Sequence, residues 1–259
     1  MDKEDIRKRV RKGYARIAGD SCSCGCGPSS CCGEGTSADQ FFSGAGYSPE
    51  EIASVPEGAV LGLACGNPLS FGKPVAGETV LDLGSGPGLD CFLAAKAVGP
   101  GGSVIGVDMT PEMIDKARRN AASGGFENVE FRLGEIENLP AADNSVDIVI
   151  SNCVVNLSPE KGRVFEEAFR VLKPGGRLVV SDVVLLKPLP EELRESEDLL
   201  VGCVANAEMK EAYCALVRRA GFQEVDVLQE KGYSIEGCGE NAAAASVVVR
   251  GVKPRSAGK

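Results

Sequence analysis

Two hydrophobic patterns alternate along most of the chain. From about residue 75, short runs of Val, Ile and Leu are separated by longer segments with helical periodicity. This alternation is typical of an α/β fold in which helices connect the strands of a mostly parallel sheet, because strands buried on both faces are apolar at nearly every position. Seven runs predict a seven-stranded sheet, at residues 79–83, 103–107, 129–133, 146–150, 177–183, 224–228 and 246–251.

The N-terminal segment has a different pattern. Between residues 4 and 18 the apolar positions Ile6, Val10, Tyr14 and Ile17 recur at helical spacing, with Lys and Arg around them. This predicts an amphipathic helix that covers the domain and leaves its basic face in solvent. Binding of that face to a membrane surface or a partner is the alternative.

A Gly, Ser and Cys-rich stretch follows at residues 21–33. Such a composition cannot bury a core, so it predicts a loop that exposes its thiols. We therefore divide the chain into residues 1–59, the N-terminal helix and Cys-rich loop, residues 60–251, the catalytic domain, and residues 252–259, a C-terminal tail.

Composition narrows the classes of function. The 259 residues carry a net charge of −9, which argues against nucleic-acid binding. No apolar run reaches the roughly 20 residues of a membrane helix, and the charged start of the chain is unlike a signal peptide, so we expect a cytoplasmic protein. Eleven cysteines there favour metal, metalloid or redox chemistry over disulfides. The chain has no histidine, so its chemistry must proceed without imidazole.

The first predicted strand runs into a glycine-rich turn that opens a helix. A turn of this kind lets the backbone approach a ligand closely. Leu89 stands where the dinucleotide-binding fingerprint requires its third glycine, so a pyrophosphate ligand fits poorly. Asp82 precedes the turn, where its carboxylate would attract a cationic cofactor. The residues predicted to bind cofactor here are Asp82, Gly84, Ser85, Gly86 and Asp90.

Acidic residues also end the next two predicted strands. Asp108 follows the glycines by about twenty residues, the spacing at which a carboxylate binds both ribose hydroxyls. Glu135 follows the third strand, where an acidic side chain or the adjacent amide can bind an adenine amino group; an ordinary solvated loop acid is the alternative. The neighbouring residues Met109, Ile136 and Asn152 complete the predicted cofactor site.

At this point the chain resembles the class I S-adenosylmethionine-dependent methyltransferases, over residues 60–251. The segment from Leu172 to Leu178, with Pro174-Gly175-Gly176, is similar to the turn before their fifth strand. The resemblance implies S-adenosylmethionine as methyl donor and a sheet ordered 3-2-1-4-5-7-6, with the last strand antiparallel and helices on both faces. It does not name an acceptor, because one fold hosts many sites.

Three cysteines in separate segments are the candidates for the acceptor site. Cys153 directly follows the fourth strand, and Cys65 and Cys203 stand in Gly-flanked segments outside the predicted strands. Converging at one sheet edge, they would form a three-thiolate cup for a soft ion such as arsenite. Zinc is the alternative in the N-terminal loop, but the short Cys-x-Cys-x-Cys spacing there is not that of a structural zinc site.

These segments are similar to motifs of the arsenite methyltransferase family. The matching motifs are Gly62-Leu63-Ala64-Cys65-Gly66-Asn67-Pro68, Asp108-Met109-Thr110, Arg132-Leu133-Gly134-Glu135-Ile136-Glu137, Ser151-Asn152-Cys153, Asn156-Leu157-Ser158 and Gly202-Cys203-Val204. The resemblance implies that Cys65, Cys153 and Cys203 hold trivalent arsenic and that Cys31 or Cys32 is a further redox-active thiol. Asn206-Ala207 departs from the small-residue pattern expected beside the third cysteine.

Arsenic bound by thiolates attacks a methyl group with its lone pair and loses no proton, which agrees with the absence of histidine. We therefore expect arsenite and methylated arsenicals as substrates, with thioredoxin or small thiols such as glutathione as reductant. Methylation of a small organic carbon or oxygen acceptor, and a thiol-based metalloid or redox sensor, are the alternatives. Cys91 and Cys214 are expected to be buried apolar residues, whereas Cys238, Cys22, Cys24 and Cys26 have no assigned role.

Overall fold

A computed structural model of the chain describes residues 2–19, 38–62, 64–194, 196, 199, 200, 202–235, 238 and 242–255. Its strands form one sheet in the order β3-β2-β1-β4-β5-β7-β6. The first five strands are parallel, and β7 runs antiparallel to both β5 and β6. The predicted order and the antiparallel last strand are confirmed. The strands are β1 (Thr79–Leu83), β2 (Ser103–Asp108), β3 (Val129–Leu133), β4 (Val146–Asn152), β5 (Leu172–Leu185), β6 (Gln223–Tyr233) and β7 (Ala244–Val252).

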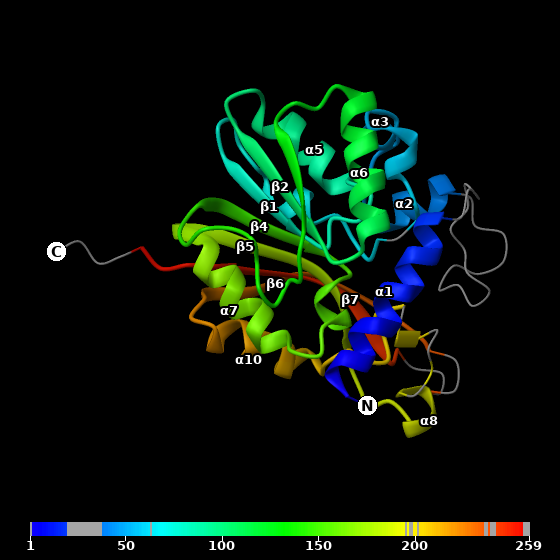
Figure 1. Cartoon of the computed structure of the whole chain (residues 1–259). Coiled ribbons are helices and arrows are strands. Elements are labelled where there is room, and N and C mark those ends of the chain that lie inside the picture. Colours follow the sequence, from blue (N-terminus) through cyan, green and yellow to red (C-terminus); the bar gives the residue numbers. More distant parts are fainter. Residues whose placement is uncertain are drawn as a thin grey trace.

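Helices cover both faces of this sheet (Figure 1). The helices are α1 (Lys3–Gly19), α2 (Ala38–Ala45), α3 (Pro49–Ala53), α4 (Pro68–Gly72), α5 (Leu89–Val98), α6 (Pro111–Gly124), α7 (Lys161–Val171), α8 (Glu191–Arg194) and α10 (Lys210–Arg219), with short 3-10 turns η1 (Glu57–Ala59) and η2 (Val155–Leu157). Neighbouring residues of one strand face opposite layers. Val80 packs in the core that α5 and α6 cover, whereas Leu81 packs in the core beneath α7 and α10.

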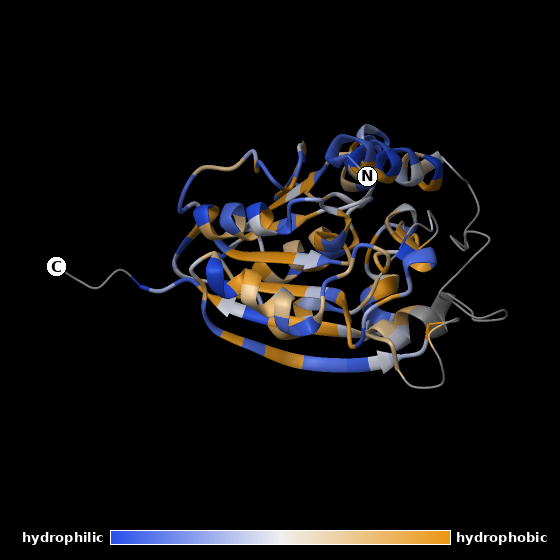
Figure 2. Ribbon diagram, turned by 90° about the horizontal axis from the view of Figure 1, so that it is seen from below, coloured by the Kyte–Doolittle hydropathy of each residue, from blue (hydrophilic) through white to orange (hydrophobic). Residues whose placement is uncertain are grey.

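The predicted strands differ from the observed ones most at the edge strand β6 and the interior strand β5. β6 extends to Tyr233 instead of ending at residue 228. Its side chains are exposed or half-buried along its whole length, so hydrophobic pattern carries little information about where it ends. Figure 2 shows this strand as a mixture of hydrophilic and hydrophobic residues. β5 begins at Leu172 instead of residue 177, because Leu172 pairs with Val146 ahead of an irregularity in the ladder.

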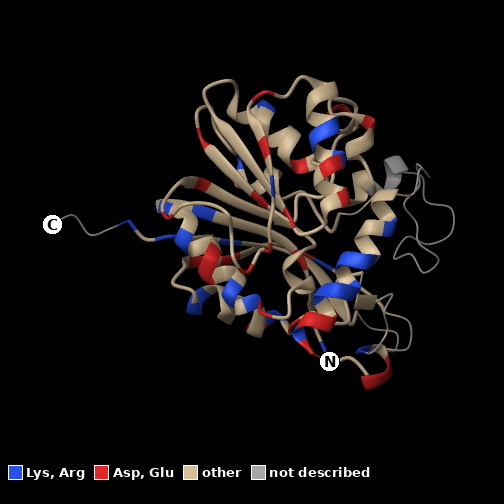
Figure 3. Ribbon diagram, in the orientation of Figure 1, with Lys and Arg blue, Asp and Glu red and all other residues tan. Residues whose placement is uncertain are grey.

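Helix α1 lies across the carboxyl ends of the parallel strands, far from them in sequence (Figure 1). Its Val10 is fully buried in a third cluster together with Val183 and Leu185 of β5 and with Cys203. Lys and Arg are concentrated along the helix, and acidic residues lie near the strand ends that it crosses (Figure 3). No helix among the described residues is long and apolar enough to cross a membrane.

Candidate functional site

A cavity lies where the carboxyl ends of β1, β2 and β4 meet helix α1. It encloses about 1030 Å³, part of it open to solvent. Asp82, Asp108 and Asn152 line it from the strand ends, and Val10 and Tyr14 line it from α1. This is the edge at which ligands bind in open α/β sheets, because the strand order reverses there between β1 and β4.

The glycine turn after β1 is folded back onto β2. The amides of Gly84 and Ser85 donate to the carbonyl of Val107 at 2.8 and 3.0 Å. Gly84 has a φ of +67°, and a Cβ there would collide with Val154, so this position requires glycine. Ser85 Oγ is buried and has no hydrogen-bond partner among the described atoms, which leaves it available to a ligand in the cavity.

Three buried carboxyl groups surround this turn. Asp108 accepts hydrogen bonds from the amides of Gly86 at 3.0 Å and Thr110 at 2.8 Å, which fixes its orientation. Burial raises the pKa of Asp90 to about 6, against the lowering effect of hydrogen bonds from Tyr47 and Asn152. Burial and the nearby charge of Asp90 raise the pKa of Asp82 well above its usual value. An incoming cation would lower these pKa values and be held by the ionised carboxylates.

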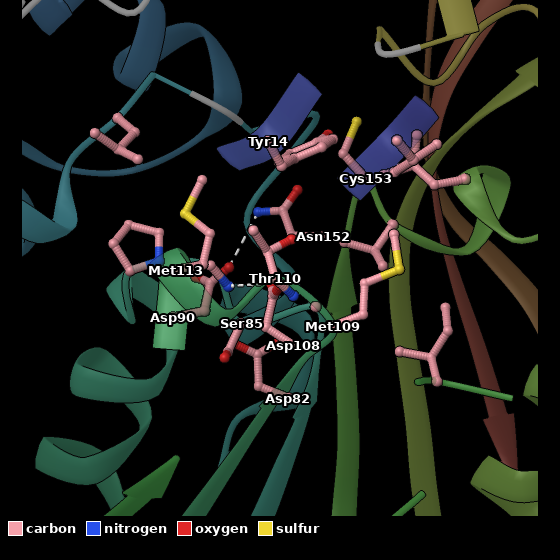
Figure 4. A pocket seen from close by; sticks show the side chains of 18 of the residues that line it. Tyr14, Asp82, Ser85, Asp90, Asp108, Met109, Thr110, Met113, Asn152 and Cys153 are labelled. Atoms are coloured by element: carbon pink, nitrogen blue, oxygen red, sulfur yellow. Dashed lines mark hydrogen bonds between the residues drawn. The ribbon is translucent and has the colours of Figure 1, made fainter. Parts of the chain in front are cut away.

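These features fit S-adenosylmethionine, which carries an ammonium, a sulfonium, a ribose and an adenine. Carboxylates are placed for the positive charges and the ribose, and the free Ser85 hydroxyl can serve either as donor or as acceptor. The side chains of Met109 and Ile136 form an apolar part of the cavity wall. Figure 4 shows Asp82, Ser85, Asp90, Asp108 and Asn152 gathered on one side of the cavity.

The Glu135 side chain faces helix α1, and binding of the adenine amino group by this side chain or by the adjacent amide stays a prediction. Glu135 does not line the cavity; its carboxylate lies 3.3 Å from Arg11 Nη2 and 3.8 Å from Arg7 Nε, both on α1. Ile136 and Glu137 form the cavity wall at this edge instead. Residues 135–137 follow the end of β3. Only some of their side chains can face the ligand, and the sequence does not indicate which ones.

Asn152, at the end of β4, joins the cofactor side of the cavity to the cysteine side. Its Nδ2 lies 2.8 Å from the hydroxyl of Tyr47, 2.7 Å from the carbonyl of Gly66 and 3.1 Å from Asp90 Oδ2. Tyr47 in turn donates to Asp90 Oδ1 at 2.7 Å. The segment before α4, which carries Cys65, is thereby attached to the centre of the sheet.

The three predicted acceptor cysteines come from separate segments and meet at this place. Cys65 and Cys153 are joined as a disulfide, with Cα atoms 5.5 Å apart, a pairing that the sequence did not predict. Cys203 is 2% exposed, and its thiol donates to the backbone carbonyl of Cys153 at 2.7 Å. Among the described residues no three Cys, Asp or Glu side chains are arranged to hold a metal ion, so the three-thiolate cup stays a prediction for the reduced protein.

Backbone geometry gives two of these cysteines a special position. Cys153 and Cys203 have φ values of +59° and +64°, in the left-handed region that non-glycine residues rarely adopt. The amide of Cys153 donates to the carbonyl of Ser181 on β5 at 2.8 Å, which holds the residue as it leaves β4. Strained conformations of this kind cluster at functional sites, where the surrounding structure enforces them.

Tyr14 is a site residue that the sequence reasoning missed. It stands between the cofactor side and the cysteine side of the cavity, and Figure 4 shows its ring beside Cys153. Burial raises the pKa of Tyr14 well above its usual value, and hydrogen bonding to Cys203 adds to this effect. The apolar face of the predicted helix indicated that Tyr14 packs against the domain. It did not indicate that Tyr14 lines a cavity.

The remaining cysteines have mixed outcomes. Cys91 and Cys214 are buried as predicted, at 0% and 6% exposure. Cys91 is not merely apolar, because its thiol lies 3.3 Å from Asp82 Oδ2. Cys238 is half-buried, and its carbonyl accepts a hydrogen bond from Lys187. The predicted redox residues Cys31 and Cys32, together with Cys22, Cys24 and Cys26, lie outside the described residues.

The chain is similar to known methyltransferases. The profile of a methyltransferase-domain family matches residues 74–221, inside the predicted catalytic region. The chain is 54% identical over 237 residues to an arsenite methyltransferase of Halobacterium salinarum, covering 87% of this chain and 59% of that protein. It is 42% identical over 152 residues to human arsenite methyltransferase, covering 55% of this chain and 40% of that protein. The chain thus spans about three fifths or less of these relatives.

A solved structure agrees with these sequence relationships. The crystal structure of an arsenic(III) S-adenosylmethionine methyltransferase from Chlamydomonas reinhardtii matches with a TM-score of 0.66 and 36% identity. The match covers 85% of this chain and 74% of that one.

Proposed function

We infer that this chain, which belongs to the S-adenosylmethionine-dependent arsenite methyltransferase family, transfers methyl groups from S-adenosylmethionine to trivalent arsenic. The observation that carries this proposal is that Cys65 and Cys203 both contact Cys153, which lines the cofactor cavity. We propose residues 60–251 as the catalytic unit, with helix α1 of the N-terminal segment as one wall of its cavity.

The cofactor side of the cavity binds and orients the donor. We propose that Asp108 accepts the ribose hydroxyls, and that Asp82 and Asp90 face the positively charged end. When bound, S-adenosylmethionine supplies an electrophilic methyl group on a sulfonium. Helix α1 restricts solvent on the opposite side, which strengthens the attraction between the carboxylates and a cation.

The cysteine side holds the acceptor. We propose that the thiols of Cys65, Cys153 and Cys203 bind arsenite as thiolates, their three protons leaving with its three hydroxyl groups as water, and that the arsenic lone pair is then directed away from the sulfurs. Soft thiolates suit this soft ion, and no general base is required because no proton leaves arsenic during transfer. Catalysis then rests on alignment of arsenic, methyl carbon and leaving sulfur.

The reaction also requires electrons. Each transfer uses the arsenic lone pair, so arsenic passes formally from the trivalent to the pentavalent state and S-adenosylhomocysteine leaves. Two thiols that form a disulfide return two electrons to arsenic. We propose that Cys65 forms this disulfide with Cys32 or Cys31, and that thioredoxin or a small thiol such as glutathione restores it. A sulfur in the Cys65–Cys153 disulfide cannot hold arsenic, so this bond must be reduced before arsenite binds. We propose that the same reductants reduce it.

Release of S-adenosylhomocysteine tests this function. The reduced protein is incubated with labelled S-adenosylmethionine and either arsenite, a panel of small phenols and amines, or no acceptor. We expect product only with arsenite, and methylated arsenicals by mass spectrometry. Turnover on an organic acceptor without arsenite would support the organic methyltransferase, and arsenite binding without turnover would support a sensor.

A further inference from the structure

The segment that carries Cys203 is a compact series of turns. The amide of Cys203 donates to the carbonyl of Leu200 at 3.1 Å, and the amide of Ala207 donates to the carbonyl of Val204 at 3.0 Å. The second bond closes a turn around Asn206, and the first residue of this turn, Val204, directly follows Cys203. The position of Asn206 is thereby linked to that of the cysteine.

The side chain of Asn206 crosses from this segment to the loop after β4. Its Nδ2 donates to the carbonyl of Asn156 at 2.8 Å and to the carbonyl of Ser158 at 3.0 Å. An amide nitrogen has two hydrogens, so both are used on one loop. A side chain without this pair of hydrogens cannot make the same bridge.

The accepting loop is itself firmly attached to the sheet. Asn156 is fully buried, and its amide and its Nδ2 donate to Asp182 of β5 at 3.2 and 2.9 Å. Ser158 donates to Glu137 at 2.6 Å. Cys153 stands three residues before Asn156 in the same loop. The Asn206 side chain therefore connects the segment of one acceptor cysteine to a fixed point beside the other.

Another bond joins the two segments, but it cannot survive arsenic binding. The Cys203 thiol donates to the carbonyl of Cys153. A thiolate bound to arsenic has no hydrogen to donate, so loading of the site breaks this bond. The two hydrogen bonds of Asn206 involve no group that reacts and remain in place.

We propose that Asn206 is a positioning residue for the arsenic acceptor: it fixes the separation of Cys153 and Cys203 by tying their segments together through two backbone carbonyls. This inference rests on the proposed arsenite methyltransferase function. It assigns Asn206 to acceptor binding and not to the cofactor, whose carboxylate ligands lie at the ends of β1 and β2.

The test compares Asn206→Ala and Asn206→Asp with a matched control. Asn128 likewise donates its Nδ2 to two carbonyls, of Ala95 at 3.1 Å and Gly99 at 3.0 Å, but it precedes β3 at the opposite end of the sheet. Asn128→Ala thus removes a similar pair of bonds away from the site. Affinity is measured with phenylarsine oxide, a trivalent arsenical with two exchangeable positions, by calorimetry in a phosphine reductant, alongside KM and kcat for arsenite.

We expect both Asn206 variants to bind phenylarsine oxide about tenfold more weakly and to have a similarly raised KM for arsenite. A tenfold change corresponds to part of the free energy of the two neutral hydrogen bonds that are lost. Affinity for S-adenosylmethionine should stay at the wild-type value. Asn128→Ala should lower the melting temperature without changing either arsenical measurement. If the Asn206 variants, like the control, have a lower melting temperature but unchanged arsenical affinity and KM, the inference about Asn206 is overturned and the proposed function is not. A wild-type protein that does not methylate arsenite would overturn the proposed function.

Discussion

The backbone amide of Cys65 donates a hydrogen bond to Asn152 Oδ1 at 3.0 Å. This contact joins residues 87 positions apart, one in the segment before the sheet and one at the end of its central strand β4. The same carboxamide contacts Asp90 on the cofactor side. Asn152 therefore aligns the acceptor segment with the cofactor cavity through a neutral side chain beside a buried carboxyl group.

Replacing Asn152 by aspartate tests that neutrality. Asn152→Asp would place a carboxylate where Nδ2 lies 3.1 Å from Asp90 Oδ2. We expect a loss of about 2 to 3 kcal/mol in unfolding free energy at pH 8, and a smaller loss at pH 5, because Asp90 has a pKa of about 6 and is then largely protonated. Urea unfolding at both pH values measures this. Asn152→Ala is the control, and an equal deficit for the aspartate variant at both pH values would contradict the expectation.

Replacement of Asp182 should change the unfolding free energy with a pH dependence of the opposite sign. Asp182 is fully buried beneath the acceptor loop, and burial raises its pKa to about 6 despite hydrogen bonds from Val183, Tyr213 and Asn156. A raised pKa means that the group's contribution to stability is complete below about pH 4 and is lost as pH rises through 6. We expect the deficit of Asp182→Asn relative to wild type to shrink by about 2 kcal/mol from pH 4 to pH 7. A deficit that is constant or grows over this range in urea unfolding would argue against the assignment.

Helix α1 should control retention of the cofactor. Arg7 lies 2.7 Å from Glu160, 3.3 Å from Glu137 and 3.8 Å from Glu135, and its side chain is 15% exposed. Arg7→Glu reverses these attractions and should loosen the cavity wall formed by α1, so we expect the Kd for S-adenosylmethionine to rise about tenfold.

Arg9 on the same helix is exposed, so Arg9→Glu makes an equal change of net charge away from the cavity. Calorimetry on both variants separates docking of the helix from general electrostatics. Equal weakening by the two substitutions would mean that α1 acts only through its charge.

The division of labour among the cysteines follows from the bonds on arsenic. Arsenite has three exchangeable positions and methylarsonous acid has two, so the second transfer needs only two thiolates. We expect Cys153→Ser and Cys203→Ser to abolish both transfers, and Cys65→Ser to lose activity on arsenite while retaining it on methylarsonous acid. Serine keeps the approximate shape but is a harder and far less acidic ligand.

The double variant Cys31→Ser, Cys32→Ser is expected to behave like Cys65→Ser. Product analysis with each arsenical under one reductant measures the set. Equal loss on both substrates for Cys65→Ser would reject this division while leaving methyl transfer itself in place.

Sequence pattern predicted the centre of the fold well because burial determines it. β1 has the predicted bounds and α1 differs by one residue at each end, since in both the apolar positions coincide with the buried face. The edge strand β3 also has the predicted bounds, although only Phe131 of its side chains is buried. β6 was predicted too short because its last residues pair through the backbone while their side chains face solvent. Backbone pairing at an exposed edge leaves no hydrophobic signal.

The site residues that stand at the ends of parallel strands could be predicted from the sequence. Asp82 and Asp108 lie at the cavity because the carboxyl ends of parallel strands share one edge. Contacts between distant segments could not be predicted: the wall formed by Tyr14, the engagement of Glu135 by α1, and the bond between Cys91 and Asp82 depend on how side chains orient after docking. The pairing of Cys65 with Cys153 is of the same kind.

The most direct test of the central claim is a single turnover. Reduced protein, loaded with one equivalent of arsenite and freed of excess reductant, is mixed with S-adenosylmethionine carrying a labelled methyl group, and arsenic species and S-adenosylhomocysteine are quantified together. We predict that labelled methylarsenic and S-adenosylhomocysteine form in equal amounts, and that Cys153→Ser and Cys203→Ser form neither while still binding the cofactor. Labelled methylarsenic formed by either variant at the wild-type yield, or no transfer by the loaded wild-type protein, would contradict this prediction.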